Sequence, residues 1–154
     1  MKDNVKQRPV AVYFLLLLVF LESVSGLFGG AALLLDPAGN ILQMSTSFLK
    51  NSPFINYVIP GFILFVFLGI YPAILFFGLL KLPYSQAFNS INLYKNQHWS
   101  WTLTLYLGIV LILWIDIETM FIGYNFLQTV FGVGGVVILI LDLLPSVKEY
   151  YLVV

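Results

Sequence analysis

The sequence has no cysteine, one histidine and few charges: only 9% of its 154 residues are Asp, Glu, Lys or Arg. Without cysteine the chain can form neither a disulfide nor a thiolate metal site. Because His98 is alone, a multi-histidine metal or haem site would need several chains. The seven basic and seven acidic residues balance, so no basic field indicates nucleic acid. We therefore expect no metal, no cofactor and no nucleic-acid partner.

Apolar residues make up 60% of the chain. In soluble domains roughly a quarter of the residues are charged, whereas only 9% are charged here. A charged fraction this low indicates a surface that mostly faces lipid. A spanning helix needs about 20 apolar residues, and four runs are long enough. These runs are residues 10–35, 54–80, 99–124 and 126–147, within one transmembrane domain over 1–154. The sequence therefore predicts an all-α fold, an integral membrane antiparallel four-helix bundle.

Two polar connections separate the first three runs. Residues 36–52 begin with Asp-Pro-Ala-Gly-Asn, which contains the residue types typical of turns. At their end, Ser52-Pro53 predicts an N-cap and a first-turn proline for the second span. Residues 82–98 contain tyrosines and polar side chains, and we expect a short interfacial helix within 88–94.

Two features of the spans predict close helix packing. Pro60 and Pro72 lie inside the second span, where a proline kinks the helix and frees a carbonyl that a neighbour must satisfy. Gly26 and Gly30 of the first span form a small-xxx-small pair, which lets two backbones approach closely. We therefore expect this face of the first helix to pack on another helix.

The basic residues predict the orientation. One side of a four-span arrangement holds Lys2, Lys6, Arg8, Lys81, Lys95 and Lys148. Only Lys50 falls on the other side, so the positive-inside rule places both termini in the cytoplasm. A secretory signal in residues 1–26 is the competing interpretation, because the basic start and the small residues at 23–25 fit one. The apolar run continues past that point, which favours a span.

Acidic residues inside the spans are the candidate functional groups, because a carboxylate at membrane depth is costly and marks a function or a buried polar contact. Glu22 lies in the first span, and Asp116 and Glu118 lie in the third, about 160° apart on the helix. Asn125 and Gln128 follow at the outer end of the fourth span. These five residues are the candidates for binding a ligand or a proton, and none is expected to be catalytic or a metal ligand.

Two interpretations of these acids stay open. In the structural one, a neutral acid hydrogen-bonds a neighbouring helix and contributes about 0.6–2 kcal/mol. In the functional one, the acids line a pocket for a proton, a cation or a small polar ligand, open to the outer side. No Lys, Arg or His lies inside a predicted span to pair with them. Asp142, near the inner end of the fourth span, is expected to extend to the interface.

The chain contains several short strings of note: DPAG at 36–39, SPF at 52–54, PG at 60–61, the stretch 114–124 and FLQ at 126–128. They resemble a group of small uncharacterised bacterial four-span membrane proteins over about residues 26–145. The resemblance implies the fold and a bacterial inner-membrane location, but no activity, and implies that uncharged residues also occur at the position of Glu118. A more distant similarity to DoxX-like proteins offers no motif that carries over a redox role.

We therefore expect an integral protein of the cell inner membrane, without catalysis of its own, that binds a partner or a small ligand. The lipid bilayer, a second copy or another membrane protein are the expected partners. The alternative is a small transporter subunit or proton- or cation-binding protein that uses Glu22, Asp116 and Glu118. A membrane redox subunit is the third interpretation.

Overall fold

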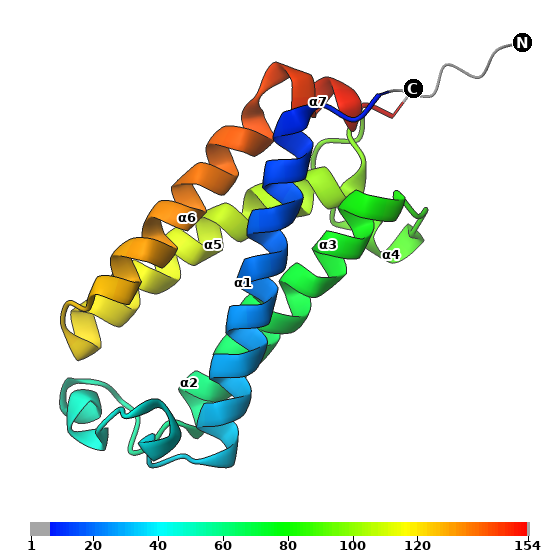
Figure 1. Ribbon diagram of the computed structural model, residues 1–154. Coiled ribbons are helices and arrows are strands. Elements are labelled where there is room, and N and C mark those ends of the chain that lie inside the picture. The colour runs from blue at the N-terminus through cyan, green and yellow to red at the C-terminus, as the bar shows by residue number, and fades with distance from the viewer. Residues whose placement is uncertain (1–6, 154) are drawn as a thin grey trace, which may run out of the picture.

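The computed structural model describes residues 7–153 as a bundle of four long apolar helices (Figure 1). Three of them are α1 (Val10–Leu35), α5 (Trp99–Ile122) and α6 (Phe126–Leu143). The remaining span is built from α2 (Val58–Ile63), the π-helical η3 (Leu64–Ile70) and α3 (Tyr71–Lys81). All four are long and apolar enough to cross a membrane, and residues 7–153 contain no strand. The predicted all-α membrane bundle is confirmed.

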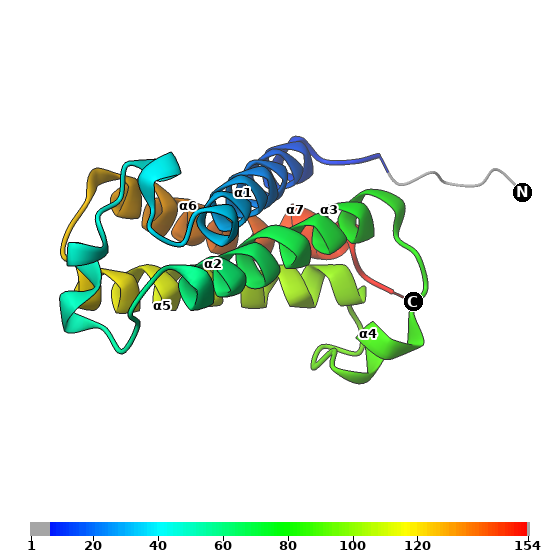
Figure 2. The ribbon, with the colours of Figure 1, turned by 90° about the horizontal axis from the view of Figure 1, so that it is seen from below.

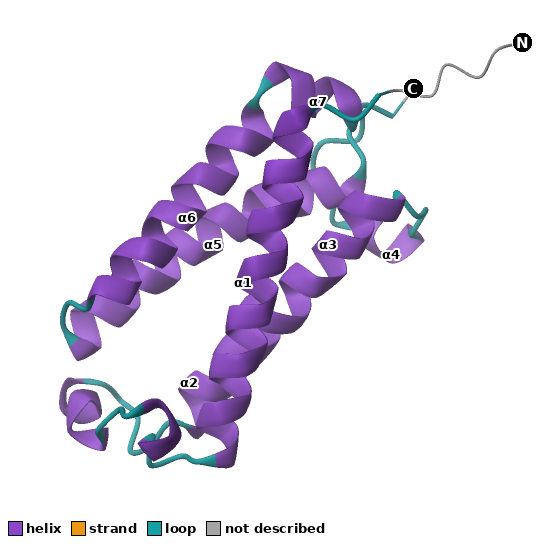
Figure 3. Ribbon diagram, in the orientation of Figure 1, coloured by secondary structure: helices purple, strands orange, loops and turns teal. Residues whose placement is uncertain are grey.

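The helices form two antiparallel pairs. The α1 helix lies against α2, η3 and α3, and α5 lies against α6, while α1 also contacts α6 and α3 contacts α5. Irregular backbone is confined to the turns at the helix ends (Figure 3). One end of the bundle, the loop end, holds η1 (Asn40–Leu42) and η2 (Thr46–Asn51) (Figure 2). The opposite end, the terminal end, holds both described chain ends, as an even number of spans requires.

Two predicted span boundaries are wrong. The second span begins at Val58, because the Ser52 hydroxyl accepts a hydrogen bond from Phe54 N (3.2 Å) and closes a local turn instead of capping a helix. The fourth span ends at Leu143. Leu144 is extended, as a residue before proline prefers, and Pro145 then starts the separate helix α7 (Pro145–Tyr150).

The second connection contains the short helix α4 (Gln86–Ser90), slightly earlier than the interfacial helix expected within 88–94. The rest of this connection pairs with the C-terminal segment. His98 N donates to Tyr151 O (2.9 Å) and Val153 N to Asn96 O (3.0 Å). These bonds hold α7 at the terminal end, next to the start of α1 (Figure 1).

The two prolines of the second span have different consequences. Pro60 lies in the first turn of α2, where a backbone N–H has no partner within the helix, so its missing N–H costs no helical hydrogen bond. Pro72 is the second residue of α3, in the first helical turn after the π-helix ends at Ile70. Ser23 Oγ donates to Gly69 O (3.0 Å), so a neighbouring helix does satisfy a carbonyl near the proline.

A close helix contact lies where the sequence predicts it, at Gly26 and Gly30 of α1. A Cβ on Gly26 would collide with the Leu68 carbonyl oxygen, and a Cβ on Gly30 would lie 2.5 Å from Phe65 N. Both clashes are with the backbone of η3, which cannot rotate away. The small residues therefore set the spacing between α1 and the second span.

Candidate functional site

A cavity of about 250 Å³ lies at the loop end, between the two helix pairs and under η2. Its walls come from the end of α1, the segment around η2, α2 and the last turns of α5. Its lining includes Phe54, Tyr57, Ile63, Trp114, Glu118 and Phe121. Nearly all of its surface is apolar, and its partly enclosed volume could hold a small molecule.

Helix periodicity brings the α5 residues of this wall together. Trp114, Glu118 and Phe121 are spaced by four and three residues, which places them on one face of α5. Asp116 lies on a different face and is exposed on the outside of the bundle. The two acids therefore do not line one pocket, because about 160° of helix rotation separates them.

Glu118 is half-buried and is the only acid in the cavity wall, which contains no Lys, Arg or His. Its carboxyl group makes no hydrogen bond to another described residue. Tyr57, just before α2, is 2% exposed and its hydroxyl donates to Ser45 O (2.8 Å). Burial raises the pKa of the Tyr57 phenol above its usual range, and the negative charge of Glu118 raises it further. The charge of Glu118 thus acts on the opposite wall of the cavity.

Glu22 is buried in α1, 7% exposed, and does not line this cavity. It points into the bundle, as its position beside Gly26 indicated, and its carboxyl group forms no hydrogen bond within residues 7–153. Its neighbour Ser23 makes the helix contact instead, through Gly69 O. The structure therefore separates Glu22 from Glu118.

Asn125 and Gln128 form the capping box of α6. Asn125 Oδ1 accepts from Leu127 N (2.9 Å), and Gln128 Oε1 accepts from Asn125 N (2.8 Å). Neither residue lines the cavity, and both have a clear local role in starting the helix. The spacing of Asn and Gln at a helix start is a known capping signature, so the sequence contained this signal. Gln128 Nε2 is buried and has no hydrogen-bond partner in the part of the chain that the structure describes.

Asp142 is fully buried at the terminal end of α6, and the expectation that it extends to the interface is wrong. Neither carboxyl oxygen has a hydrogen-bond partner within residues 7–153, although the backbone carbonyl of Asp142 accepts from Trp101 Nε1 (2.8 Å). The buried Tyr151, which follows α7, is close enough that the Asp142 charge raises the pKa of its phenol, after the larger effect of burial. Because α7 folds over this end, Asp142 does not reach water.

His98 has a structural role at the start of α5. Its Nδ1 lies 2.7 Å from Ser100 Oγ and 3.3 Å from Ser100 N, and its Nε2 lies 3.2 Å from Pro83 O. Burial lowers the pKa of this imidazole. These contacts occupy both ring nitrogens, so His98 holds the second connection to α5.

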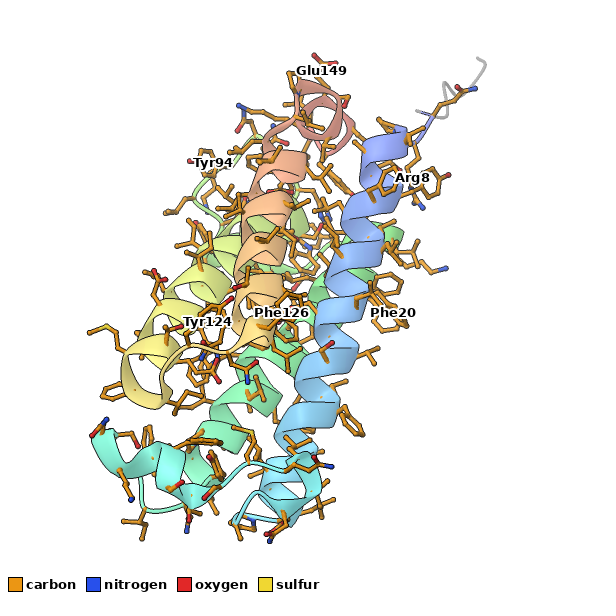
Figure 4. All side chains as sticks on the ribbon, turned by 60° about the vertical axis from the view of Figure 1, so that its left-hand side comes forward. Arg8, Phe20, Tyr94, Tyr124, Phe126 and Glu149 are labelled. Atoms are coloured by element: carbon orange, nitrogen blue, oxygen red, sulfur yellow. The ribbon has the colours of Figure 1, made fainter. Side chains whose placement is uncertain are left out.

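The basic residues gather at the terminal end. Arg8 Nη2 donates to Leu80 O (3.0 Å) and its Nε to Tyr150 Oη (3.3 Å), joining the start of α1 to α3 and α7. Figure 4 shows Arg8 and Glu149 at this same end. Lys81, Lys95 and Lys148 lie in elements of this end, and Lys50 lies in η2. Lys2 and Lys6 lie outside the described residues.

Comparisons with known proteins identify no relative. No protein-family model matches the chain, and no curated protein or solved structure matches it either. The resemblance to four-span bacterial proteins stays a prediction. Within residues 7–153, no group of three His, Cys, Asp or Glu side chains could hold a metal ion. The four long apolar helices make the chain a multi-pass membrane protein.

Proposed function

We propose that this membrane protein binds a small, mainly apolar ligand in the loop-end cavity. The observation that carries this proposal is the apolar cavity itself, with one carboxyl group, Glu118, that has no hydrogen-bond partner among the described residues. Ligand sites typically combine an apolar wall with a few polar groups that orient the ligand. The protein would supply binding and orientation, and no catalytic residue is needed.

We also propose a bacterial inner-membrane location with both termini in the cytoplasm. Arg8, Lys81, Lys95 and Lys148 support it, because all lie at the terminal end while Lys50 lies at the loop end. In this orientation the cavity faces the outer side of the membrane. A ligand could then enter from that side or from the outer leaflet.

The experiment that tests ligand binding is native mass spectrometry of the protein extracted gently from its own membrane. We expect wild-type protein to retain a small molecule, and Ile63→Trp to lose it because the indole would fill the cavity. Ile59→Trp is the matched control, since Ile59 lies one turn away on α2, is 54% exposed and does not line the cavity. Retention of only bilayer lipid, equal in all three proteins, would refute the proposal.

Proton binding is the second candidate, and a specific observation favours it. Glu22 and Asp142 are both buried in spans that contain no cation, and neither carboxyl group has a hydrogen-bond partner within residues 7–153. Infrared difference spectra should show a carboxylic-acid band that appears on acidification and is reduced in Glu22→Gln or Asp142→Asn. Identical spectra in wild-type protein and both variants would contradict this role. Transport would also require a second copy, because four helices are few for an alternating-access pathway.

A further inference from the structure

The lining of the loop-end cavity indicates the chemical class of its ligand, an inference that rests on the proposed function above. We propose that the ligand is a lipophilic cation, an amine or quaternary ammonium with a small apolar body, whose positive charge pairs with Glu118. Three features of the wall support this class: its charge, its aromatic rings and the state of its hydroxyl groups.

The charge of the wall favours a cation over an anion. Glu118 is the only ionisable group among the lining residues besides the phenol of Tyr57, and no basic residue lines the cavity. In surroundings this apolar, a carboxylate attracts a cation more strongly than it would in water, and it repels an anion equally strongly. The other described cations cannot replace a ligand here, because Arg8, Lys81, Lys95 and Lys148 lie at the opposite end and Lys50 does not line the cavity.

The aromatic rings of the wall suit the same ligand. Trp114 and Phe121 lie on the Glu118 face of α5, four residues before it and three after it, and Phe54 and Tyr57 come from the facing loop. Aromatic ring faces attract cations, with Trp the strongest, and such rings are a common means of binding quaternary ammonium groups. An acid flanked by aromatic rings therefore offers a cation both a counter-charge and favourable walls.

The hydroxyl groups of the wall are already used as donors inside the protein. Tyr57 Oη donates to Ser45 O (2.8 Å), and Ser52 Oγ donates to Leu49 O (2.9 Å). Among the lining residues, the Trp114 indole N–H is then the one side-chain donor that makes no hydrogen bond to a described residue. A ligand that only accepts hydrogen bonds would find a single donor beside a repelling carboxylate, whereas a cation or N–H donor would find a free acceptor in Glu118.

The cavity size limits the ligand. A volume of about 250 Å³ is just below the range of about 300–1,000 Å³ that is common for drug-sized ligands. The body of the cation must therefore be small, comparable to one aromatic ring with a short substituent. Ile117, which is 49% exposed and lines the cavity, places one wall at the bundle surface, so an apolar body can enter from the bilayer.

The test uses two probes of the same shape: benzyltrimethylammonium, which is a cation, and neopentylbenzene, its neutral isostere. Binding is measured by equilibrium dialysis against the full-length protein in phosphatidylcholine nanodiscs, with empty nanodiscs as the blank. We expect Glu118→Gln to weaken binding of the cation by about tenfold or more, consistent with loss of a charge pair in apolar surroundings. Binding of neopentylbenzene should stay the same. Asp116→Asn is the matched control, because it removes an acid from the outside of the same helix.

The outcomes separate the two proposals. Three results together would show that the cavity binds ligands but that the cation class is wrong. In that case neopentylbenzene binds as tightly as the cation, Ile63→Trp abolishes binding of both probes, and Glu118→Gln changes the binding of neither probe. The same conclusion follows if Asp116→Asn weakens cation binding as much as Glu118→Gln. If neither probe binds above the blank and native mass spectrometry shows no retained ligand, the proposed function itself is refuted.

Discussion

Replacing Gly26 by alanine should destabilise the bundle more than any other single-methyl change in α1. The added Cβ would lie 2.6 Å from Gly69 N and still closer to the Leu68 carbonyl group. Ordinary contact with a Cβ begins near 3.4 Å, so α1 and η3 must separate by at least ~0.8 Å, the difference between these two distances. No side-chain rotation can relieve the clash, because the nearest atoms belong to the backbone.

The free energy of the change has two parts. Overpacking a well-packed contact typically costs about 1–3 kcal/mol. The same separation would stretch the Ser23 Oγ to Gly69 O bond, now 3.0 Å, beyond the hydrogen-bond limit of about 3.5 Å. An interhelical bond of this kind contributes about 0.6–2 kcal/mol. We therefore expect Gly26→Ala to lower the free energy of unfolding by about 2–5 kcal/mol before helix propensity is counted.

Reversible unfolding in mixed micelles, followed by circular dichroism, measures this loss. Alanine favours a helix over glycine by about 1 kcal/mol, so a control must carry the same propensity gain. Gly134→Ala provides it, because a Cβ on Gly134 has no atom within 4 Å. Gly29→Ala provides a second control, since its Cβ would meet only the Leu64 Cδ2 methyl, at 3.2 Å. Stability of Gly26→Ala within about 0.5 kcal/mol of Gly134→Ala would refute the close-packing argument.

Three further predictions concern the two ends of the bundle. Arg8→Gln should loosen the terminal end, because Arg8 joins α1 to α3 and α7, and faster amide hydrogen exchange in α7 with unchanged exchange in α2 would show it. The pKa of Tyr57 is raised in the folded protein, so the unfolded chain loses its phenol proton first as the pH rises. The contribution of Tyr57 to stability is therefore complete below the ordinary pKa of about 10, and it is lost as the pH rises through the raised pKa. Glu118→Gln should lower the Tyr57 pKa, measured by tyrosinate absorbance against Tyr57→Phe, and an unchanged titration would contradict the electrostatic contact. In this cysteine-free chain, an impermeant thiol reagent added outside intact cells should label Asn40→Cys but not Gln86→Cys, and the reverse pattern would overturn the orientation.

The local features of the candidate site were partly predictable. Helix periodicity alone places Asp116 and Glu118 on different faces, and the structure has one outside the bundle and the other in the cavity wall. The roles of Asn125 and Gln128 were also readable, because a capping box depends on spacing within one turn. The start of the second span was missed because Ser52-Pro53 fits both a helix start and a local turn. Only contacts with the rest of the loop decide between them.

The four spans, the all-α class and the packing of the Gly26 face on another helix could be predicted from the sequence, because apolar length and small-residue spacing are local properties of one helix. Only the packing of the helices shows which polar groups of residues 7–153 face a cavity, which are buried without a described partner and which lie exposed on the outside of the bundle. Asp142 shows the reason: its burial depends on α7, Trp101 and Tyr151, which reach it only when separate parts of the chain come together. The cavity at Glu118 likewise exists only where α1, η2, α2 and α5 meet, so no single stretch of sequence contains it.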